Sequence, residues 1–321
     1  MRWVVYGAGA VGGVLGARLY DAGHDVVLVA RGPHLEVICE RGLTLATPDG
    51  TRTLPVPAVG TAADLDTGQP TTVLLAVKSH QTHTAIEDLT GAVSPSTPVV
   101  SVQNGVANEP TLLRFFDDVQ GVCVMMPTGH LEPGVVEQHC SPVPGLIDVG
   151  RFPGGCDETT RRIAEAFRSA GFESEPRPDI MAWKHRKLLM NLGNAVQACC
   201  GESDGASDLA DRARAEGEAV LAAAGISVIT AETDRARRGG ILNVREVPGR
   251  PRGGGSSWQS LRRGTGSIES DYLNGEVVLL GRLHGEPTPV NELLRSTAQR
   301  LAREGALPGS LDAADLLRQL R

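Results

Sequence analysis

The chain has few aromatic residues, no excess of positive charge and no long apolar run. Its 321 residues include only five Phe, three Tyr and three Trp, which leaves little side-chain surface for stacking on bases. Acidic residues outnumber basic ones, 38 to 31, and the formal net charge is −7. This balance argues against a broad surface for nucleic acid or anionic membranes. No stretch approaches the roughly 20 apolar residues of a membrane-spanning helix, so we expect neither nucleic acid nor a membrane as a partner.

The six cysteines lack the spacing of zinc sites and of disulfide frameworks. None falls in a C-x-x-C motif, and the adjacent Cys199 and Cys200 are poorly placed for a structural disulfide. His80 and His83 are expected at an exposed helix start, so no metal site is predicted. The N-terminal apolar segment runs directly into glycines, unlike a secretory signal. We therefore expect a cytoplasmic protein.

Apolar runs rich in β-branched residues alternate with helical stretches in the first half of the chain. Four runs are continuous enough to be strands covered on both faces of a parallel sheet. They comprise residues 2–6, 25–29, 72–77 and 98–102. A helix is expected at residues 10–22, a hairpin around Pro48-Asp49-Gly50, and further strands within residues 119–149. The pattern predicts a doubly wound sheet of the Rossmann type.

The composition changes after about Arg177. Helical patterns follow at residues 180–199, 209–224 and 290–304, and a Gly/Arg-rich segment at 249–257 is typical of a mobile loop. At roughly 150 residues per domain, the length suits two domains. We therefore predict an α/β fold class, with an N-terminal Rossmann-type, doubly wound domain at residues 1–177 and a mostly α-helical C-terminal domain at residues 178–321.

A G-x-G-x-x-G motif joins the first predicted strand to the first predicted helix. In that position its glycines permit a tight turn, a close approach of the backbone to a pyrophosphate, and close helix–strand packing. The free N–H groups at the start of the helix then bind the phosphates. The predicted cofactor-binding residues of this motif are Gly7, Gly9, Ala10, Val11 and Gly12.

The residue after the second predicted strand indicates which dinucleotide binds. Sites for NAD usually place an acidic residue there, on the ribose hydroxyls, but this strand runs into Ala30 and Arg31. An arginine pairs well with a 2′-phosphate, so NADP(H) is the predicted cofactor. Lys78 and Gln103-Asn104-Gly105 follow two further strands, at the edge where α/β sheets bind ligands. Lys78 and Asn104 are therefore also predicted to bind cofactor or substrate.

A helical window at residues 182–197 carries an unusual polar face. Steps of about 100° per residue place Trp183, Lys187, Asn191 and Asn194 on one side. Asn is unfavourable inside helices unless its amide finds partners. A hydrogen-bonded core network is one interpretation. The functional one is a lysine that faces a cleft, where its ammonium group stabilises and protonates the oxygen of a ketone that receives a hydride.

This combination resembles the ketopantoate reductase (2-dehydropantoate 2-reductase) family. The similarity lies in GAGAVG, in Arg31, and in AVKSHQT, VQNGV and KLLMN at residues 76–82, 102–106 and 187–191. Ser256-Ser257-Trp258 resembles a family Ser-Ser-Met segment, and Glu269 follows Ser257 by twelve positions, as in the family. Asp271, Asn274-Gly275 and GEPTPVN at 285–291 complete the ordered set.

The resemblance implies NADPH-dependent reduction of a small 2-oxo acid, of the 2-dehydropantoate type, in a cleft between the two domains. It implies that Lys187 is the general acid and that Glu269 orients Lys187 or binds a substrate hydroxyl. It also implies that substrate is held by Asn104, Asn191 and Ser257, with Lys78 on the cofactor. Asn194, on the same predicted helix face, completes the predicted substrate-binding residues.

Three departures from the family pattern fall on substrate contacts. Ala195 and Leu261 stand where the family usually carries asparagine and aspartate, and Cys200-Gly-Glu-Ser-Asp204 lacks a further substrate asparagine. An alternative is therefore the same chemistry on a different ketone of specialised metabolism. A second alternative is a non-catalytic, NADP(H)-binding redox sensor. A homodimer through the helical domain is compatible with the sequence, which indicates no interface.

Overall fold

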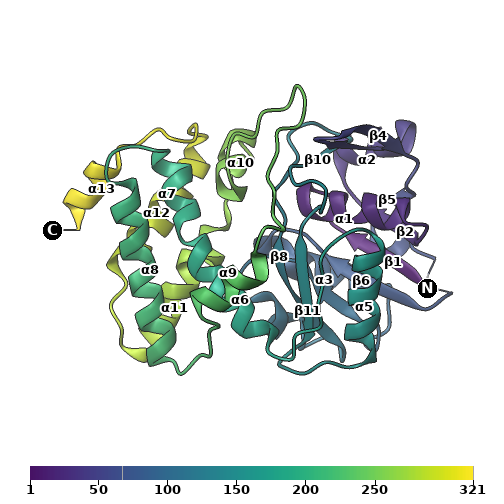
Figure 1. Cartoon of the computed structure of the whole chain (residues 1–321), viewed down its shortest axis with the longest axis horizontal. Helices are drawn as coiled ribbons and strands as arrows, with labels where there is room; N and C mark the ends of the chain where they lie inside the picture. The colour runs from purple at the N-terminus through teal and green to yellow at the C-terminus, as the bar shows by residue number, and fades with distance from the viewer. Residues whose placement is uncertain (67, 321) are drawn as a thin grey trace. The chain divides into compact units, whose positions relative to one another are not determined.

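The computed structural model describes residues 1–66 and 68–320. Contacts divide the chain into two compact units. Figure 1 labels the helices and strands along the chain. The first unit comprises Met1–Gln103, Asn108–Met181 and Glu232–Arg252. The second comprises Asn104–Ala107, Ala182–Ala231 and Gly253–Arg321. Each unit therefore contains at least one segment from the other half of the sequence.

The first unit is built on a seven-stranded sheet in the order β11-β8-β7-β6-β1-β2-β5. All neighbouring strands are parallel except β8 and β11. The strands are β1 (Arg2–Tyr6), β2 (Asp25–Val29), β5 (Ala58–Val59), β6 (Thr71–Leu75), β7 (Val99–Ser101), β8 (Val119–Met125) and β11 (Leu146–Arg151). The chain runs outward from β1 in both directions, so the strand order reverses there. Ligands of such sheets bind beyond the carboxyl ends of the strands at this reversal.

Helices cover both faces of this sheet, as its continuous apolar strands predicted. Alternate residues of a strand point to opposite faces; Trp3 and Val5 belong to one apolar cluster, and Val4 and Tyr6 to another. The first cluster includes residues of α1 (Ala10–Asp21), α2 (Gly32–Arg41) and α5 (Glu158–Ser169). The second includes residues of η1 (Ala62–Asp64), α3 (Thr82–Thr90) and α4 (Asn108–Leu112). The predicted doubly wound arrangement is confirmed.

A four-stranded sheet, ordered β4-β3-β10-β9, completes the first unit. Its strands are β3 (Leu43–Thr47), β4 (Gly50–Leu54), β9 (Thr128–Gly129) and β10 (Val135–Gln138). Strands β3 and β4 form the predicted hairpin, and Gly50 adopts a φ of +143°. Such a φ is accessible to glycine but costly for other residues, which is why the turn falls here.

The second unit is helical, as predicted. Its elements are α6 (Ile180–Asn191), which begins in the first unit, and α7 (Gly193–Cys200), α8 (Ala206–Ala223), α10 (Ser256–Arg263), η3 (Glu269–Tyr272), α11 (Asn274–His284), α12 (Pro289–Glu304) and α13 (Ala313–Gln319). Helix α10 begins at Ser256, so the last two residues of the predicted loop at 249–257 are helical. No helix of the described residues is both long and apolar enough to cross a membrane.

The continuous helix predicted at residues 180–199 is interrupted at Leu192. The Leu192 carbonyl oxygen accepts a hydrogen bond of 3.2 Å from the side-chain amide of Asn274, the first residue of α11. That amide also donates to Asn291 over 3.0 Å. These bonds connect the junction of α6 and α7, where Leu192 keeps helical angles of φ −60° and ψ −32°, to α11 and α12. The break places Asn194 on a separate helix, α7.

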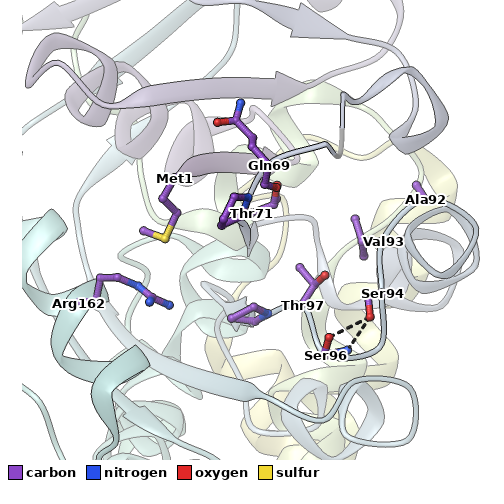
Figure 2. A pocket seen from close by; sticks show the side chains of 11 residues that line it. Met1, Gln69, Thr71, Ala92, Val93, Ser94, Ser96, Thr97 and Arg162 are labelled. Carbon is purple, nitrogen blue, oxygen red and sulfur yellow. Dashed lines mark hydrogen bonds between the residues drawn. The ribbon is translucent and has the colours of Figure 1, made fainter.

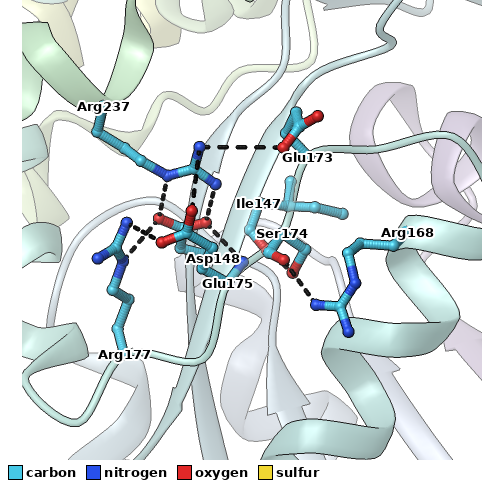
Figure 3. A network of polar contacts seen from close by, with 8 residues as sticks. All are labelled: Ile147, Asp148, Arg168, Glu173, Ser174, Glu175, Arg177 and Arg237. Carbon is cyan, nitrogen blue, oxygen red and sulfur yellow. Dashed lines mark hydrogen bonds and ion pairs between the residues drawn. The ribbon is translucent and has the colours of Figure 1, made fainter.

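The segment at residues 232–252, predicted to belong to the second domain, packs instead within the first unit. The guanidinium of Arg237, on α9 (Ala231–Arg238), donates to both carboxylate oxygens of Asp148 on β11, over 2.8 and 3.0 Å. Arg177 donates to the same carboxylate over 2.9 Å (Figure 3). Asp148 is fully buried, and a buried carboxylate is costly unless it is paired. This requirement explains why the segment packs here.

Candidate active site

The three glycines of the G-x-G-x-x-G motif have different structural environments. Gly7 adopts a φ of +102°, and a Cβ there would lie 2.8 Å from Val77 Cγ1 and 2.9 Å from the Val77 backbone nitrogen. A Cβ at Gly12 would collide with the Gly7 carbonyl oxygen. A Cβ at Gly9 would meet no atom within 4 Å. Gly7 and Gly12 thus allow the tight turn and close packing, whereas the backbone at Gly9 borders open space.

Helix α1 begins directly after this turn, with Gly9 as its N-cap residue. No side chain caps the helix, and no acidic residue lies in its first turn. The first N–H groups of a helix, here those of Ala10, Val11 and Gly12, have no partner within the helix. Together with the positive end of the helix dipole, they form a site suited to an anion such as a pyrophosphate.

His34 fixes the position of this turn, a role that the sequence did not indicate. The Gly134 backbone N–H donates to His34 Nδ1 over 2.8 Å, so that nitrogen is unprotonated. The other ring nitrogen, Nε2, lies 2.8 Å from the Ala8 carbonyl oxygen and donates to it. Burial lowers the pKa of His34, which favours this neutral form. The ring thereby joins α2, the glycine turn and the connection between β9 and β10.

Arg31 lies where the sequence placed it, immediately after β2, as the N-cap residue of α2. Its side chain is 60% exposed. One terminal nitrogen, Nη2, donates to the Tyr6 hydroxyl over 3.0 Å, and that hydroxyl donates to Asp88 over 2.6 Å. Burial, reinforced by Asp88, raises the pKa of Tyr6, which keeps the phenol protonated. The sequence did not indicate a role for Tyr6 or for Asp88. Tyr6 lies in the apolar strand β1.

The ends of β6 and β7 lie beside the glycine turn. Val77, which packs against Gly7, accepts through its carbonyl oxygen a 2.9 Å hydrogen bond from the Gln103 side chain. Lys78 follows directly, half-buried, as the N-cap residue of η2 (Ser79–Gln81). Lys78 is therefore the direct chain neighbour of Val77, the residue that packs against the glycine turn. Asn104, which was likewise predicted to bind cofactor or substrate, belongs to the second unit.

Within the second unit, the loop at residues 104–107 contacts the helical elements. Asn191, at the end of α6, donates through its side chain to the Asn104 side-chain oxygen over 3.4 Å. Gly105, with a φ of +78°, approaches η3 so closely that a Cβ would lie 2.9 Å from the Tyr272 carbonyl oxygen. Lys187 precedes Asn191 by one helical turn and is half-buried. The structure thus joins two of the predicted substrate-binding residues, Asn104 and Asn191.

Helix α10 and η3 bring together the other predicted residues. Glu269 is 5% exposed, and the Ser256 hydroxyl lies 3.5 Å from its carboxylate. Ser257, the predicted substrate-binding residue, is the buried neighbour of Ser256. Asn194 lies near the start of α10, since a Cβ on Gly255 would be 3.7 Å from its side-chain oxygen. The structure pairs Ser256, and not Ser257, with Glu269.

The polar face predicted for a single helix is divided by the break at Leu192. Lys187 and Asn191 share α6, whereas Asn194 lies on α7 and turns toward the start of α10. Met190, next to Asn191 on α6, is 37% exposed. Gln197 on α7, which the sequence did not indicate, accepts a 2.9 Å hydrogen bond from the Gly255 N–H. Periodicity alone could not predict where one helix ends and the next begins.

A hollow of about 500 Å³ lies at the opposite edge of the large sheet. Its lining, drawn in Figure 2, includes Thr71 at the start of β6, Pro98 just before β7, and Arg162 of α5. These positions are at the amino ends of the strands, whereas the glycine turn follows the carboxyl end of β1. The hollow is therefore separate from the candidate cofactor site. In the described part of the chain, no three His, Cys, Asp or Glu side chains are placed to hold a metal ion.

Comparison with known families agrees with these features. The family described as "Ketopantoate reductase PanE/ApbA" matches residues 3–154, and its C-terminal counterpart matches residues 179–302. The chain belongs to the ketopantoate reductase family. Membership of this family places the chain among the oxidoreductases, as the sequence predicted.

Relatives of this family match over nearly the whole chain. The 2-dehydropantoate 2-reductase of Halobacterium salinarum is 30% identical over 322 residues, covering 95% of this chain and 100% of the relative. That of Pyrococcus horikoshii is 28% identical, covering 92% and 95%. A solved PanE/ApbA family ketopantoate reductase from Ralstonia eutropha is 28% identical, with a TM-score of 0.80 and coverage of 95% and 99%. A D-mandelate dehydrogenase solved with NADH and anilino(oxo)acetate, 20% identical with a TM-score of 0.81, shares the fold.

Proposed function

We propose that this protein reduces a small 2-oxo acid with NADPH, and that 2-dehydropantoate, reduced to pantoate, is its substrate. The observation that carries the proposal is the hydrogen bond between Asn104 and Asn191, one helical turn from Lys187. Two amides beside a lysine can bind the carboxylate and the carbonyl of a 2-oxo acid. The names of the relatives in Halobacterium and Pyrococcus support the same substrate.

The residues of the first unit fit a nicotinamide dinucleotide phosphate. The open space at Gly9 and the uncapped start of α1 suit a pyrophosphate held by the Gly7–Gly12 turn, including Ala10 and Val11. Arg31 replaces the acidic residue of NAD sites and presents an exposed guanidinium that suits a 2′-phosphate. Lys78, which follows β6 in this unit, contributes a cation to the cofactor in this proposal. NADPH supplies the hydride when it is bound.

Lys187 is the general acid in this proposal. A hydride supplied by the cofactor would add to C2 of the substrate, and negative charge would develop on the carbonyl oxygen next to Lys187. The Lys187 ammonium group stabilises this negative charge and gives the oxygen its proton, which yields the hydroxy acid. Glu269 orients Lys187 or binds a substrate hydroxyl, while Asn191, Asn194 and Ser257 hold the substrate. The amine is later reprotonated from solvent.

The direct test follows NADPH oxidation by the full chain with 2-dehydropantoate and a panel of 2-oxo acids. We expect turnover of 2-dehydropantoate, and a decrease in kcat of about 10²–10⁴-fold in Lys187→Ala, the range typical of a lost general acid. Met190→Ala, a change at an exposed residue of the same helix, serves as the control and should retain wild-type kcat. No oxidation of NADPH with any ketone, together with tight NADPH binding, would instead identify a redox sensor.

A second candidate is the same reaction on another ketone of specialised metabolism. Ala195 on α7 and Leu261 on α10 are both buried and apolar. The family usually carries asparagine and aspartate at these positions, so polar substrate contacts are lost there. A substrate with fewer hydroxyl groups suits such a site. Turnover of an apolar 2-oxo acid in the panel, with kcat/KM at least tenfold above that for 2-dehydropantoate, would favour this candidate.

A further inference from the structure

The guanidinium of Arg31 is anchored by a buried phenol. Its Nη2 donates to the Tyr6 hydroxyl over 3.0 Å, and Tyr6 is 3% exposed. Tyr6 is the last residue of β1 and directly precedes Gly7, the first glycine of the motif. The Arg31 side chain, which comes after β2, is therefore held by the phenol of Tyr6 on the neighbouring strand β1.

The phenol is in turn held by Asp88 on α3. The Tyr6 hydroxyl donates to Asp88 Oδ2 over 2.6 Å, and the same oxygen accepts the Ala62 backbone N–H over 3.0 Å. Arg31 Nη2 lies 4.0 Å from this oxygen, too far for a direct hydrogen bond. Asp88 is thus held by two donors, and it acts on Arg31 through the phenol and through its negative charge.

This arrangement leaves most of the guanidinium available. A guanidinium carries five N–H donors in a planar fork, and the Tyr6 hydroxyl accepts from only one nitrogen. The Arg31 side chain is 60% exposed, whereas that of Asp88 is 21% exposed. An anion from solvent would therefore meet the preoriented Arg31 guanidinium, which is more exposed than the nearby Asp88 carboxylate.

We propose that Tyr6 and Asp88 determine the preference of this protein for NADPH over NADH, with opposite effects. Tyr6 is a positioning residue, because it holds Arg31 in the orientation that receives the 2′-phosphate. Asp88 limits the preference, because its negative charge opposes a second negative charge near Arg31. This inference rests on the proposed function in that it takes Arg31 as the residue that binds the 2′-phosphate.

Preorganisation of Arg31 by Tyr6 determines the direction and size of the expected change in NADPH binding. An arginine side chain loses considerable rotamer entropy when it is immobilised, at a cost of about 0.5–1.5 kcal/mol per side chain in binding. Tyr6→Phe removes only the hydroxyl and transfers that cost to the binding of NADPH. Asp88→Asn retains an oxygen that accepts from the Tyr6 hydroxyl and removes only the charge. The two changes are therefore matched to the two roles.

The test measures dissociation constants of the full chain for NADPH and NADH by calorimetric titration, in the wild type and in single variants. We expect the ratio of the NADH constant to the NADPH constant to fall about 2- to 12-fold in Tyr6→Phe. In Asp88→Asn it should rise about two- to fivefold. Tyr20→Phe is the matched control, because no hydrogen bond joins its hydroxyl to the described residues, and it should match the wild type. Thermal unfolding of each variant confirms that it is folded.

The outcomes separate this inference from the proposed function. Arg31→Ala should lower the ratio at least as much as Tyr6→Phe; an unchanged ratio in Arg31→Ala would refute the role of Arg31 and the proposed cofactor. If Arg31→Ala loses the preference while Tyr6→Phe matches Tyr20→Phe, only the role of Tyr6 is refuted. If Asp88→Asn weakens NADH binding, Asp88 binds the ribose itself, and its opposing role is wrong. Because Asp88→Asn leaves the phenol in place, it tests the charge effect even if Tyr6→Phe does not fold.

Discussion

The side-chain amide of Asn191 donates to the side-chain oxygen of Asn104, 87 positions earlier in the chain. Asn104 begins the short loop that leaves the first unit after β7, and Asn191 ends the helix that carries Lys187. The contact therefore joins the loop of Asn104 to the helix that carries Lys187. One hydrogen bond thus connects polar residues of two separate sequence motifs.

Loss of the Asn104 amide should weaken substrate recognition. A hydrogen bond to a charged group contributes about 1.5–3 kcal/mol, so we expect Asn104→Ala to lower kcat/KM for the 2-oxo acid by about 10- to 150-fold. Steady-state kinetics at varied substrate concentration measure this change. Asn243→Ala, at an exposed residue of the first unit, is the control. Equal kinetics of the two variants would contradict the role of Asn104.

Gly9 and Gly12 should respond differently to the same substitution. Gly9→Ala meets open space at an ordinary φ of −72°, so the variant should unfold at nearly the wild-type temperature. Its new methyl group would occupy the space proposed for the pyrophosphate, and NADPH should bind at least tenfold more weakly, about 1.4 kcal/mol. Calorimetric titration and thermal unfolding measure the two effects. Unchanged NADPH affinity would show that the dinucleotide does not approach Gly9.

Gly12→Ala should mainly affect folding. The new methyl group would collide with the Gly7 carbonyl oxygen and would lie 2.9 Å from Ala76 Cβ. Overpacking at a close helix–strand contact costs about 1–3 kcal/mol, so the midpoint of thermal or urea unfolding should fall. A variant as stable as Gly9→Ala would be inconsistent with the close packing at this turn.

Arg237 should be essential for the stability of the first unit. Arg237→Ala removes two of the hydrogen bonds to the fully buried carboxylate of Asp148. Breaking a buried ion pair costs about 3–5 kcal/mol, although Arg177 and the Glu175 N–H still bond to Asp148 and reduce this loss. Urea unfolding measures the change in the free energy of unfolding. Arg114→Ala, at an exposed arginine of the same unit, should leave it within about 0.5 kcal/mol of wild type.

His34 should make the stability of the protein sensitive to mild acid. Its pKa is lowered by burial in the folded chain, so the unfolded chain binds the proton more readily. The stability contributed by neutral His34 is present above the ordinary pKa near 6.5. It is lost as the pH falls from there through the lowered pKa of the folded state. The midpoint temperature of thermal unfolding should therefore fall more steeply between pH 8 and pH 5 in the wild type than in His34→Gln. Parallel curves would contradict a buried, neutral His34.

Local patterns allowed much of the first unit to be predicted. Strands β1, β2, β6 and β7 follow from continuous apolar runs, because a strand buried on both faces has no polar side. The glycine turn could be recognised because its residues are consecutive and its context is a strand followed by a helix. The open space at Gly9 and the close packing at Gly12 agree with the roles expected from the motif, but the sequence did not indicate that Ala76, more than 60 positions away, is a packing partner of Gly12.

The sequence by itself determined the fold class, the order of strands and helices, the glycine turn and a cation after the second strand. All of these depend on the types and spacing of neighbouring residues. Tertiary structure alone decided that the helix at 180–199 breaks at Leu192, that residues 232–252 pack in the first unit, and that Arg31 is held by Tyr6. In each case a polar or charged group required a hydrogen-bonding partner, and the partner lies far away in sequence. Such pairings arise only when the folded chain brings distant residues together and excludes water from them.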